Sequence, residues 1–327
     1  MQDFLYVDTD KVRSMLGQIE GGITESEHAT DKNSKRRNSA GDLPHSEYQE
    51  WGNERYVHKS FGDSIFPRLE SMLTSEGMIK DISSELTKSE YWTSANLRKE
   101  NPPGSIIRLS ALASIFDARY VASSFAGLSA AALGIKGLNE TPTAPIPPSV
   151  KKKLPKTTTP KYIPMGGSNL EDDIPDFNLG GETEGGDSGI SGQQLRSVIR
   201  LARGLFTPGL HLNLFPVEGE DFTVGARLQE GRQYLDSDPD VLFARYGTGQ
   251  QKWTIVGSIG HYAEPQVDFS FEKFVDNDDN LIRGRTAKSI NSFMGYMGSL
   301  GFLDLPQYPG FSVVPLAVYR EIPRPKL

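Results

Sequence analysis

The sequence predicts an α+β fold, in which mixed and largely antiparallel sheets pack against helices and two halves are joined by a long disordered linker. Strand-like alternation and helix-like spacing follow one another along the chain without a regular strand–helix–strand rhythm, which disfavours a doubly wound parallel sheet. Residues 139–190 are rich first in Pro, Thr and Lys and then in Gly, Asp and Glu. Such a segment has too little apolar surface to offset the entropy cost of ordering, and its length predicts a boundary.

The 327 residues are enough for two domains of ordinary size. We expect an N-terminal α+β half at residues 1–138, the linker at 139–190 and a C-terminal α+β half at 191–327. A second polar segment without periodicity, residues 25–51, predicts a disordered loop inside the N-terminal half.

Apolar spacing predicts five elements in the N-terminal half. In order, they are a strand at 4–8, a helix at 9–20, a helix at 62–79, a strand at 104–117 and a helix at 118–135. One apolar helical face supports the helix at 62–79 and comprises Phe66, Leu69, Met72 and Leu73. The apolar stretch 121–135 is shorter than the roughly 20 residues that a membrane-spanning helix needs, so we expect a buried helix and no membrane span.

The C-terminal half is predicted in the same way. Its expected elements are a helix at 193–206, strands at 210–217 and 222–229, a helix at 239–246, strands at 252–262 and 266–272, a helix at 286–302 and a strand at 311–322. Gly257 lies within an apolar strand, which indicates that another backbone approaches closely there. Three glycines in the last helix, Gly295, Gly298 and Gly301, predict close packing against a neighbour.

Three junctions share one form, in which an apolar strand end is followed by an aspartate and then by a helix with apolar periodicity. Their aspartates are Asp8, Asp117 and Asp236. A carboxylate at such a position accepts hydrogen bonds from free N–H groups and interacts favourably with the helix dipole, contributing roughly 1 kcal/mol. We therefore predict that these residues cap helices rather than handle protons. One repeated unit and coincidence both explain the shared form.

Several kinds of site are excluded by composition and spacing. The absence of Cys excludes thiolate nucleophiles and Cys-ligated metals, and suits the cytoplasmic location that we expect. The five His residues have no zinc-binding spacing, and the acidic runs at 236–240 and 276–280 lack the Gly and Glu of a calcium loop. The start of the chain lacks the pattern of a signal peptide, and no glycine-rich phosphate loop occurs. We expect no metal and no other cofactor.

One helix carries a basic stripe formed by Arg196, Arg200 and Arg203, at positions i, i+4 and i+7. This stripe is the strongest local candidate for binding an acidic or phosphate-bearing partner, although a solvated helix face explains it equally. The net charge of −7 opposes generic binding to nucleic acid. We therefore expect a protein partner rather than a nucleic acid.

Five stretches of the chain, at 4–23, 54–73, 104–122, 253–262 and 313–322, carry a resemblance to a family. They include the opening "FLYVDTD", the His-bearing "ERYVHKSFGD" and the closing "VVPLAVYREI". The chain resembles an uncharacterised bacterial family, a domain of unknown function, whose members begin with a Tyr-hydrophobic-Asp strand and end with a Pro-hydrophobic-Ala-hydrophobic-Tyr-Arg strand. The resemblance implies a bacterial cytoplasmic protein and supplies neither an activity nor catalytic residues.

Three hypotheses about function follow. The first is a non-enzymatic interaction or sensor module, as an accessory of a stress or anti-phage system. The second is an enzyme whose site assembles from dispersed polar residues, with Asp8, His58 and Asp117 as the first candidates and Arg320 beside them. The third is a nucleic-acid-binding regulator that uses the arginine stripe. Convergence of the candidate catalytic residues in one cleft would favour the enzyme.

Overall fold

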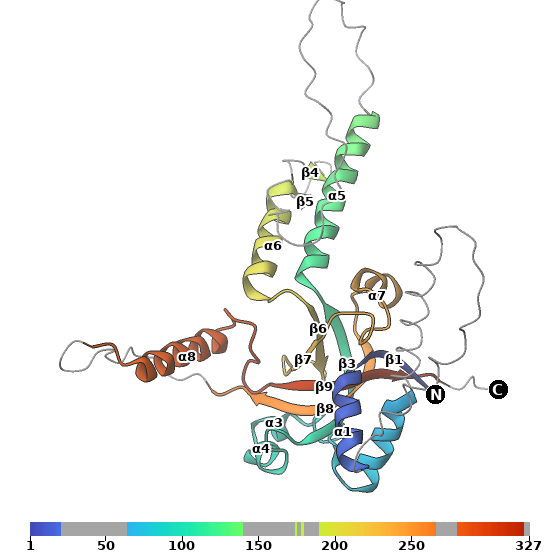
Figure 1. Ribbon diagram of the computed structural model, residues 1–327. Helices are drawn as coiled ribbons and strands as arrows, with labels where there is room; N and C mark the ends of the chain where they lie inside the picture. The colour runs from blue at the N-terminus through green and yellow to red at the C-terminus, as the bar shows by residue number, and fades with distance from the viewer. Residues whose placement is uncertain (21–63, 140–173, 175–177, 180–189, 266–279, 324–327) are drawn as a thin grey trace, which may run out of the picture. The chain divides into compact units, whose positions relative to one another are not determined.

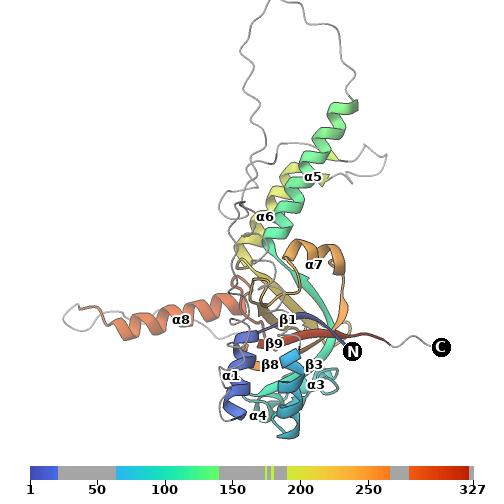
Figure 2. The same ribbon diagram turned by 45° about the vertical axis from the view of Figure 1, so that its right-hand side comes forward.

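The computed structural model describes residues 1–20, 64–139, 174, 178–179, 190–265 and 280–323 (Figures 1 and 2). It confirms the α+β class and the mixed, largely antiparallel sheet. The strands are β1 (Gln2–Val7), β2 (Ile79–Asp81), β3 (Ile106–Phe116), β4 (Asn178–Leu179), β5 (Ile190–Ser191), β6 (Leu210–Phe215), β7 (Val224–Leu228), β8 (Gln251–Tyr262) and β9 (Phe311–Glu321). The helices are α1 (Thr9–Ile19), an unlabelled helix over 64–75, α3 (Ser89–Thr93), α4 (Ala95–Glu100), α5 (Ala118–Asn139), α6 (Gly192–Leu205), α7 (Pro239–Tyr246) and α8 (Arg283–Ser299).

Five strands of the seven-stranded sheet pair in a closed ring. β9 pairs with β7, β7 with β6, β6 with β3, β3 with β8, and β8 again with β9. β1 and β2 extend this sheet from β9 and β3. The three long strands β3, β8 and β9 have 11, 12 and 11 residues, so they reach beyond the shorter β6 and β7. The additional length lets β9 pair with β1 and β3 pair with β2.

The described chain forms two compact units. Unit 1 comprises Met1–Phe116 and Gly209–Leu327, and unit 2 comprises Asp117–Pro208. These units differ from the halves expected at 1–138 and 191–327, because β3 pairs with β6 and β8 from the far side of the predicted linker. Most of that linker and the whole of the predicted loop at 25–51 lie outside the described residues.

Each expected helix or strand within the described residues has a counterpart in the structure. The strand expected at 266–272 lies outside the described residues. Sequence reasoning missed β2, α3 and α4, which have three, five and six residues, and the two-residue strands β4 and β5. All five are too short to produce a recognisable period.

One hydrophobic core of unit 1 joins α1 and the helix over 64–75 to the sheet. Its buried residues are Val7, Val12, Leu16, Ile65, Phe66, Leu69, Leu73, Val256, Leu316, Ala317 and Tyr319. Three of the four side chains predicted to share a helical face are buried in it, and Met72 packs against it. The predicted close approach at Gly257 is confirmed, because a Cβ atom there would clash with the carbonyl oxygen of Val314 and lie 2.9 Å from the Cα atom of Pro315.

Two predictions about helices need correction. The last helix ends at Ser299 rather than 302, because Gly301 adopts a φ of +79° and the Phe302 N–H bonds to the Met297 carbonyl, as in a Schellman motif. Within this helix, Gly298 packs against Leu305, whereas the space beside Gly295 is open.

The prediction that residues 121–135 form a buried helix is wrong for much of that helix. Ala122 and Ser129 are buried, but Leu128, Leu133 and Ile135 are exposed. The apolar residues therefore predicted the helix correctly, but they did not predict that several of its apolar side chains are exposed.

Candidate functional site

Asp8 lies where the buried end of β1 meets the start of α1. Its Oδ1 accepts a hydrogen bond of 3.0 Å from the Lys11 backbone N–H, and its Oδ2 lies 2.8 Å from the Lys11 ammonium. The prediction that Asp8 caps a helix is therefore confirmed. A shallow pocket lies nearby, lined by residues 4–7, Thr9 and residues 232–236. Both carboxylate oxygens of Asp8 are engaged by Lys11, which suits a structural role.

Asp117 is also engaged by its own helix. Its Oδ1 accepts a hydrogen bond of 2.8 Å from the Arg119 backbone N–H, and the Arg119 guanidinium lies 2.7 Å from its Oδ2. The cap prediction is confirmed here as well. Asp8 belongs to unit 1 and Asp117 to unit 2. His58, the third candidate catalyst, lies outside the described residues.

For Asp236 the cap prediction is wrong. α7 begins at Pro239, and Asp238 is its N-cap residue, without a capping hydrogen bond from the side chain. Asp236 instead accepts hydrogen bonds from Ser237 Oγ and from the Arg245 guanidinium. Proline is favoured at the first position of a helix, so α7 begins at Pro239 rather than directly after Asp236.

Arg320, the fourth polar residue considered for catalysis, holds an edge of the sheet. Its Nε donates a 2.7 Å hydrogen bond to Asp3 Oδ2 across the β1–β9 pair. Its guanidinium also lies 4.8 Å from the Tyr246 ring centre and 5.8 Å from that of Trp253. An ion pair together with cation–π contacts explains this arginine through stability.

The arginine stripe lies on α6, which begins with a capping box formed by Ser191 and Gln194. Arg196 is half-buried, and its Nη1 donates a 2.6 Å hydrogen bond to the carbonyl oxygen of Ile174. Arg200 and Arg203 are exposed. Arg196 thus helps to hold residue 174 in place, and a binding role for the three arginines stays a prediction.

A buried ionic cluster in unit 1 was missed by sequence reasoning. Arg108 donates to Glu70 Oε1 through Nε at 3.2 Å and Nη2 at 2.7 Å, and the Tyr319 hydroxyl donates to the same oxygen at 2.9 Å. Gln2 Nε2 donates to the other oxygen at 3.1 Å. A signal was present in the sequence, because Glu70 falls four residues after Phe66 and therefore on the predicted apolar face. The cluster fastens the helix over 64–75 to three strands.

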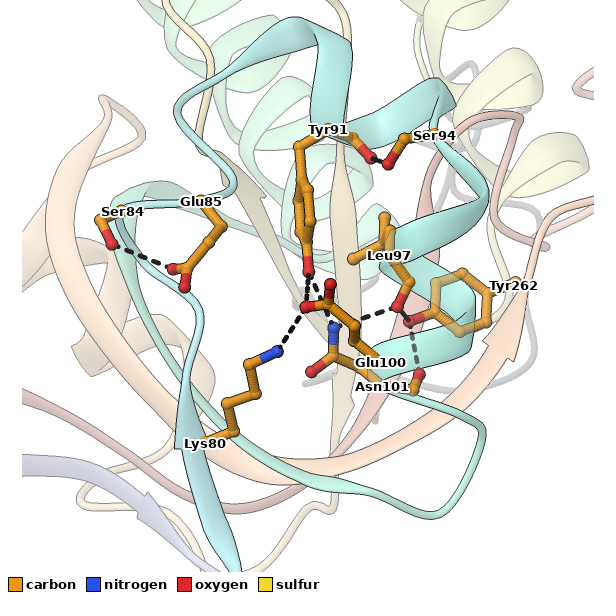
Figure 3. Close-up of polar contacts among 9 residues, drawn as sticks. All are labelled: Lys80, Ser84, Glu85, Tyr91, Ser94, Leu97, Glu100, Asn101 and Tyr262. Atoms are coloured by element: carbon orange, nitrogen blue, oxygen red, sulfur yellow. Dashed lines mark hydrogen bonds and ion pairs between the residues drawn. The ribbon is translucent and has the colours of Figure 1, made fainter.

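A second polar network links β2, α3, α4 and β8 (Figure 3). Lys80 Nζ lies 2.8 Å from Glu100 Oε2, which also accepts a 3.1 Å hydrogen bond from the Tyr91 hydroxyl. Buried Asn101 donates to the Leu97 carbonyl and to Tyr91, while the Tyr262 hydroxyl donates to the Asn101 carbonyl at 2.8 Å. The network fixes two short helices against the sheet.

The charges of this network do not suit acid–base catalysis. The hydrogen bond with Glu100 raises the pKa of Lys80, and the same contact lowers the pKa of Glu100. A catalytic lysine needs a lowered pKa, and a carboxyl group that donates a proton needs a raised one. Both shifts hold these groups in their charged forms.

His211 is the described histidine with a carboxylate nearby. It is buried on β6, and its Nε2 lies 3.8 Å from Asp304 Oδ2, which is beyond hydrogen-bonding distance. Among the residues that the structure describes, no group of three His, Asp or Glu side chains is placed to hold a metal ion.

Three buried tyrosines give the protein a predicted sensitivity to alkaline pH. Burial raises the pKa of Tyr6, Tyr262 and Tyr319, and the neighbouring carboxylates of Asp8 and Glu70 add to the effect at the first and the last. A raised pKa in the folded state means that the stability is fully present below the unfolded value of about 10 and is lost as the pH rises above it.

The expected result is therefore a fall in the free energy of unfolding above about pH 10, accompanied by delayed tyrosine ionisation. Tyrosinate absorbance followed against pH, with urea unfolding at each pH, measures both. Tyr262→Phe should remove part of the decrease in the free energy of unfolding at alkaline pH. Ionisation of all 12 tyrosines near the ordinary value, in a protein that is still folded, would contradict this prediction.

The helix α8, labelled in Figure 1, carries several exposed apolar side chains. Of its 17 residues only Ser289 and Gly298 are buried. One helical face carries Ile290, Phe293, Met294, Met297 and, just past the helix, Leu300, at spacings of three and four residues. All of these except half-buried Met297 are exposed, with Ile290 at 50% and Met294 at 47%. We call these five residues the α8 face.

Charge is distributed unevenly on α8. The helix carries Arg283, Arg285 and Lys288 and has no Asp or Glu. Cations near the N-terminus of a helix oppose its dipole, so the stability of the helix does not explain them. The α8 face with its three cations is the described surface best suited to a partner that is apolar and anionic. No helix in the described part of the chain has the length and apolar character to cross a membrane.

Comparison with known proteins identifies the family of the chain but not an activity. No curated protein and no solved structure was found to match the chain. A family model described as a domain of unknown function, DUF6414, matches residues 1–319. This match spans both compact units, and the chain therefore belongs to the DUF6414 family.

Proposed function

We propose that the chain is a non-enzymatic interaction module, in which the α8 face binds a groove on a partner protein. The observation that carries the proposal is the exposure of Ile290, Phe293, Met294 and Leu300 along one side of a single helix. Apolar side chains at i, i+3, i+4 and i+7 are the anchors by which an amphipathic helix enters a hydrophobic groove. Exposed apolar patches of this kind mark interaction sites.

The expected partner is a protein with an apolar groove and carboxylates at its rim. Phe293 and the methionines fill irregular apolar pockets well. Arg283, which lies on the same side of the helix as the α8 face, would meet the carboxylates. A protein groove is favoured over a membrane surface because the three cations lie in the first turns of α8, while the apolar face begins only at Ile290 and continues to Leu300. Three cations contribute only about 1 kcal/mol each at an anionic bilayer.

The alternative of an enzyme with Asp8, His58 and Asp117 receives no support from the described geometry. The two aspartates accept hydrogen bonds from their own helices and belong to different units. As part of the proposal, the module acts in the bacterial cytoplasm as an accessory or sensor of a stress or anti-phage system. The genomic neighbours of the coding sequence test that setting.

Photo-crosslinking in cells tests the proposal. Benzoylphenylalanine placed at Phe293 should crosslink one partner protein, and the same group at Val241, an exposed apolar position on α7, should not. With the purified partner, Phe293→Ser should weaken binding at least about tenfold, and Val241→Ser should leave it unchanged. Equal crosslinking at both positions would overturn the proposal, as would crosslinking at neither. The proposal would also be overturned if Phe293→Ser abolished binding of the chain to anionic vesicles and left binding to the protein partner unchanged.

A second candidate function is binding of a nucleic acid by the arginine stripe. The observation in its favour is that α6 carries three arginines and no acidic residue. Fluorescence anisotropy with labelled DNA and RNA tests it. Binding that weakens with added salt and is abolished by Arg200→Glu would support this candidate, and no binding by the wild-type chain would exclude it.

A further inference from the structure

Unit 2 contains a pair of helices with an apolar side that no described residue of the unit covers. α5 and α6 lie side by side and run antiparallel in both views (Figures 1 and 2). They pack through Ala122 and Phe125 of α5, and Leu195 and Ile199 of α6, around Ile174. This small core uses one face of each helix.

A second apolar face runs along α5. Leu128, Ala131, Ile135 and Leu138 are separated by three, four and three residues, which is the spacing of the seam positions in a coiled coil. All four are exposed, Ile135 at 57% and Leu138 at 88%. At about 100° per residue, this face lies roughly 120° around the helix from the buried face. α5 therefore has one apolar face for α6 and another that the described residues leave exposed.

α6 shows the same arrangement. Val198, Leu201 and Leu205 are separated by three and four residues, with Leu201 60% exposed and Leu205 half-buried. This face lies roughly 110° from the buried face of α6, in the same rotational sense as on α5. Because the two helices are antiparallel, equal rotations place both faces on the same side of the pair. We call these seven residues the hairpin strip.

The hairpin strip is uncharged. Residues 120–135 contain no charged side chain, and neither helix contains Asp or Glu. The three arginines of α6 lie roughly opposite its part of the strip. Two copies of the strip can therefore meet without burying charge, whereas a partner of either charge finds no group to pair with on this side.

We propose that the hairpin strip binds the same strip of a second copy of this chain, so that two helix pairs form a four-helix bundle. A helix hairpin with one open apolar side is half of such a bundle. A two-fold axis lets one self-complementary surface serve both copies. The proposal adds a surface in unit 2 to the proposed function, which rests on α8 in unit 1, and neither depends on the other.

Sedimentation analysis of the full chain tests the proposal. The expected species has twice the 36.0 kDa mass of one chain. Ile135→Glu should convert it to a monomer with unchanged helix content by circular dichroism. Leu133→Glu is the matched control, because Leu133 is 42% exposed on the same helix but points roughly away from the strip. It should leave the dimer intact, as should Phe293→Ser on α8.

The absence of natural Cys allows a second measurement that does not depend on destabilising a variant. Ala131→Cys and Ile135→Cys should form covalent dimers with a short bismaleimide, and Leu133→Cys should not. A wild-type monomer at all concentrations would overturn the proposal. So would a dimer that survives Ile135→Glu, equal crosslinking at 133 and 135, or a strip that binds anionic vesicles while the chain stays monomeric.

Discussion

Glu70→Ala is expected to lower the free energy of unfolding by about 3 kcal/mol, because it removes the carboxylate from the buried cluster of unit 1. The substitution leaves the buried Tyr319 hydroxyl without its acceptor and Arg108 without its carboxylate. Loss of one partner from a buried ion pair costs about 3–5 kcal/mol. The lower end applies here, since the Arg108 side chain is 26% exposed and can be solvated in part.

Urea unfolding followed by tryptophan fluorescence measures this loss. Glu264→Gln is the control, since the Glu264 side chain is 63% exposed and pairs with Arg98 at the surface, where an ion pair contributes about 0–1 kcal/mol. The double variant Glu70→Leu with Arg108→Leu should be more stable than Glu70→Leu alone, because no unpaired charge remains. Equal unfolding midpoints for Glu70→Ala and wild type would show that the cluster is not a source of stability.

Gly257→Ala should also cost about 3 kcal/mol, for a steric reason. Gly257 lies in β8, which pairs with β3 on one side and β9 on the other. An added Cβ atom would meet backbone atoms of Val314 and Pro315, which cannot move as the tip of a flexible side chain can. The register between β8 and β9 also shifts at this point.

Gly225→Ala provides the control for that variant. Gly225 is a strand glycine in β7, and a Cβ atom there would meet nothing within 4 Å. Because alanine restricts the unfolded chain more than glycine does, this change should be neutral or stabilise by about 0.5–1 kcal/mol. Thermal or urea unfolding of the two variants side by side measures the difference, and equal losses for both would contradict the steric explanation.

Local patterns in the sequence predicted most of the helices and strands, and two of the three aspartate caps. Alternation in β3 and the apolar face that includes Phe66 are properties of a few neighbouring residues, so a single sequence displays them. The cap at Asp8 followed from the same local logic. The prediction that Asp236 caps a helix was wrong because Pro239 determines where α7 begins, and the nearer of the two preceding aspartates, Asp238, takes the N-cap position.

The arrangement of the sheet was beyond local patterns. β1 and β9 come from opposite ends of the chain, and the sequence of neither strand identifies the other as its pairing partner. The expected halves assign β3 and β8 to opposite sides of the linker, whereas the two strands pair in one sheet. Glu70 was overlooked because a glutamate on a helix is ordinarily a surface residue, and its partners Arg108 and Tyr319 lie far along the chain.

The surfaces proposed for binding were hidden for a related reason. A helix with many apolar residues is expected to be buried. The sequence does not show whether the residues that bury it belong to the same chain or to a partner. Exposure of Ile135 and of the α8 face became apparent only when the other elements were placed. The candidate site thus emerged from side chains that the fold leaves uncovered rather than from a motif.

The central claim is that the carboxylates hold the fold while the α8 face carries the function. Binding of the crosslinked partner to Asp8→Asn and to Phe293→Ser, compared in one titration, tests it most directly. Asparagine caps helices as well as aspartate does, so Asp8→Asn should bind the partner with wild-type affinity, whereas Phe293→Ser should lose it. Full binding by Phe293→Ser together with lost binding by a folded Asp8→Asn would contradict the claim.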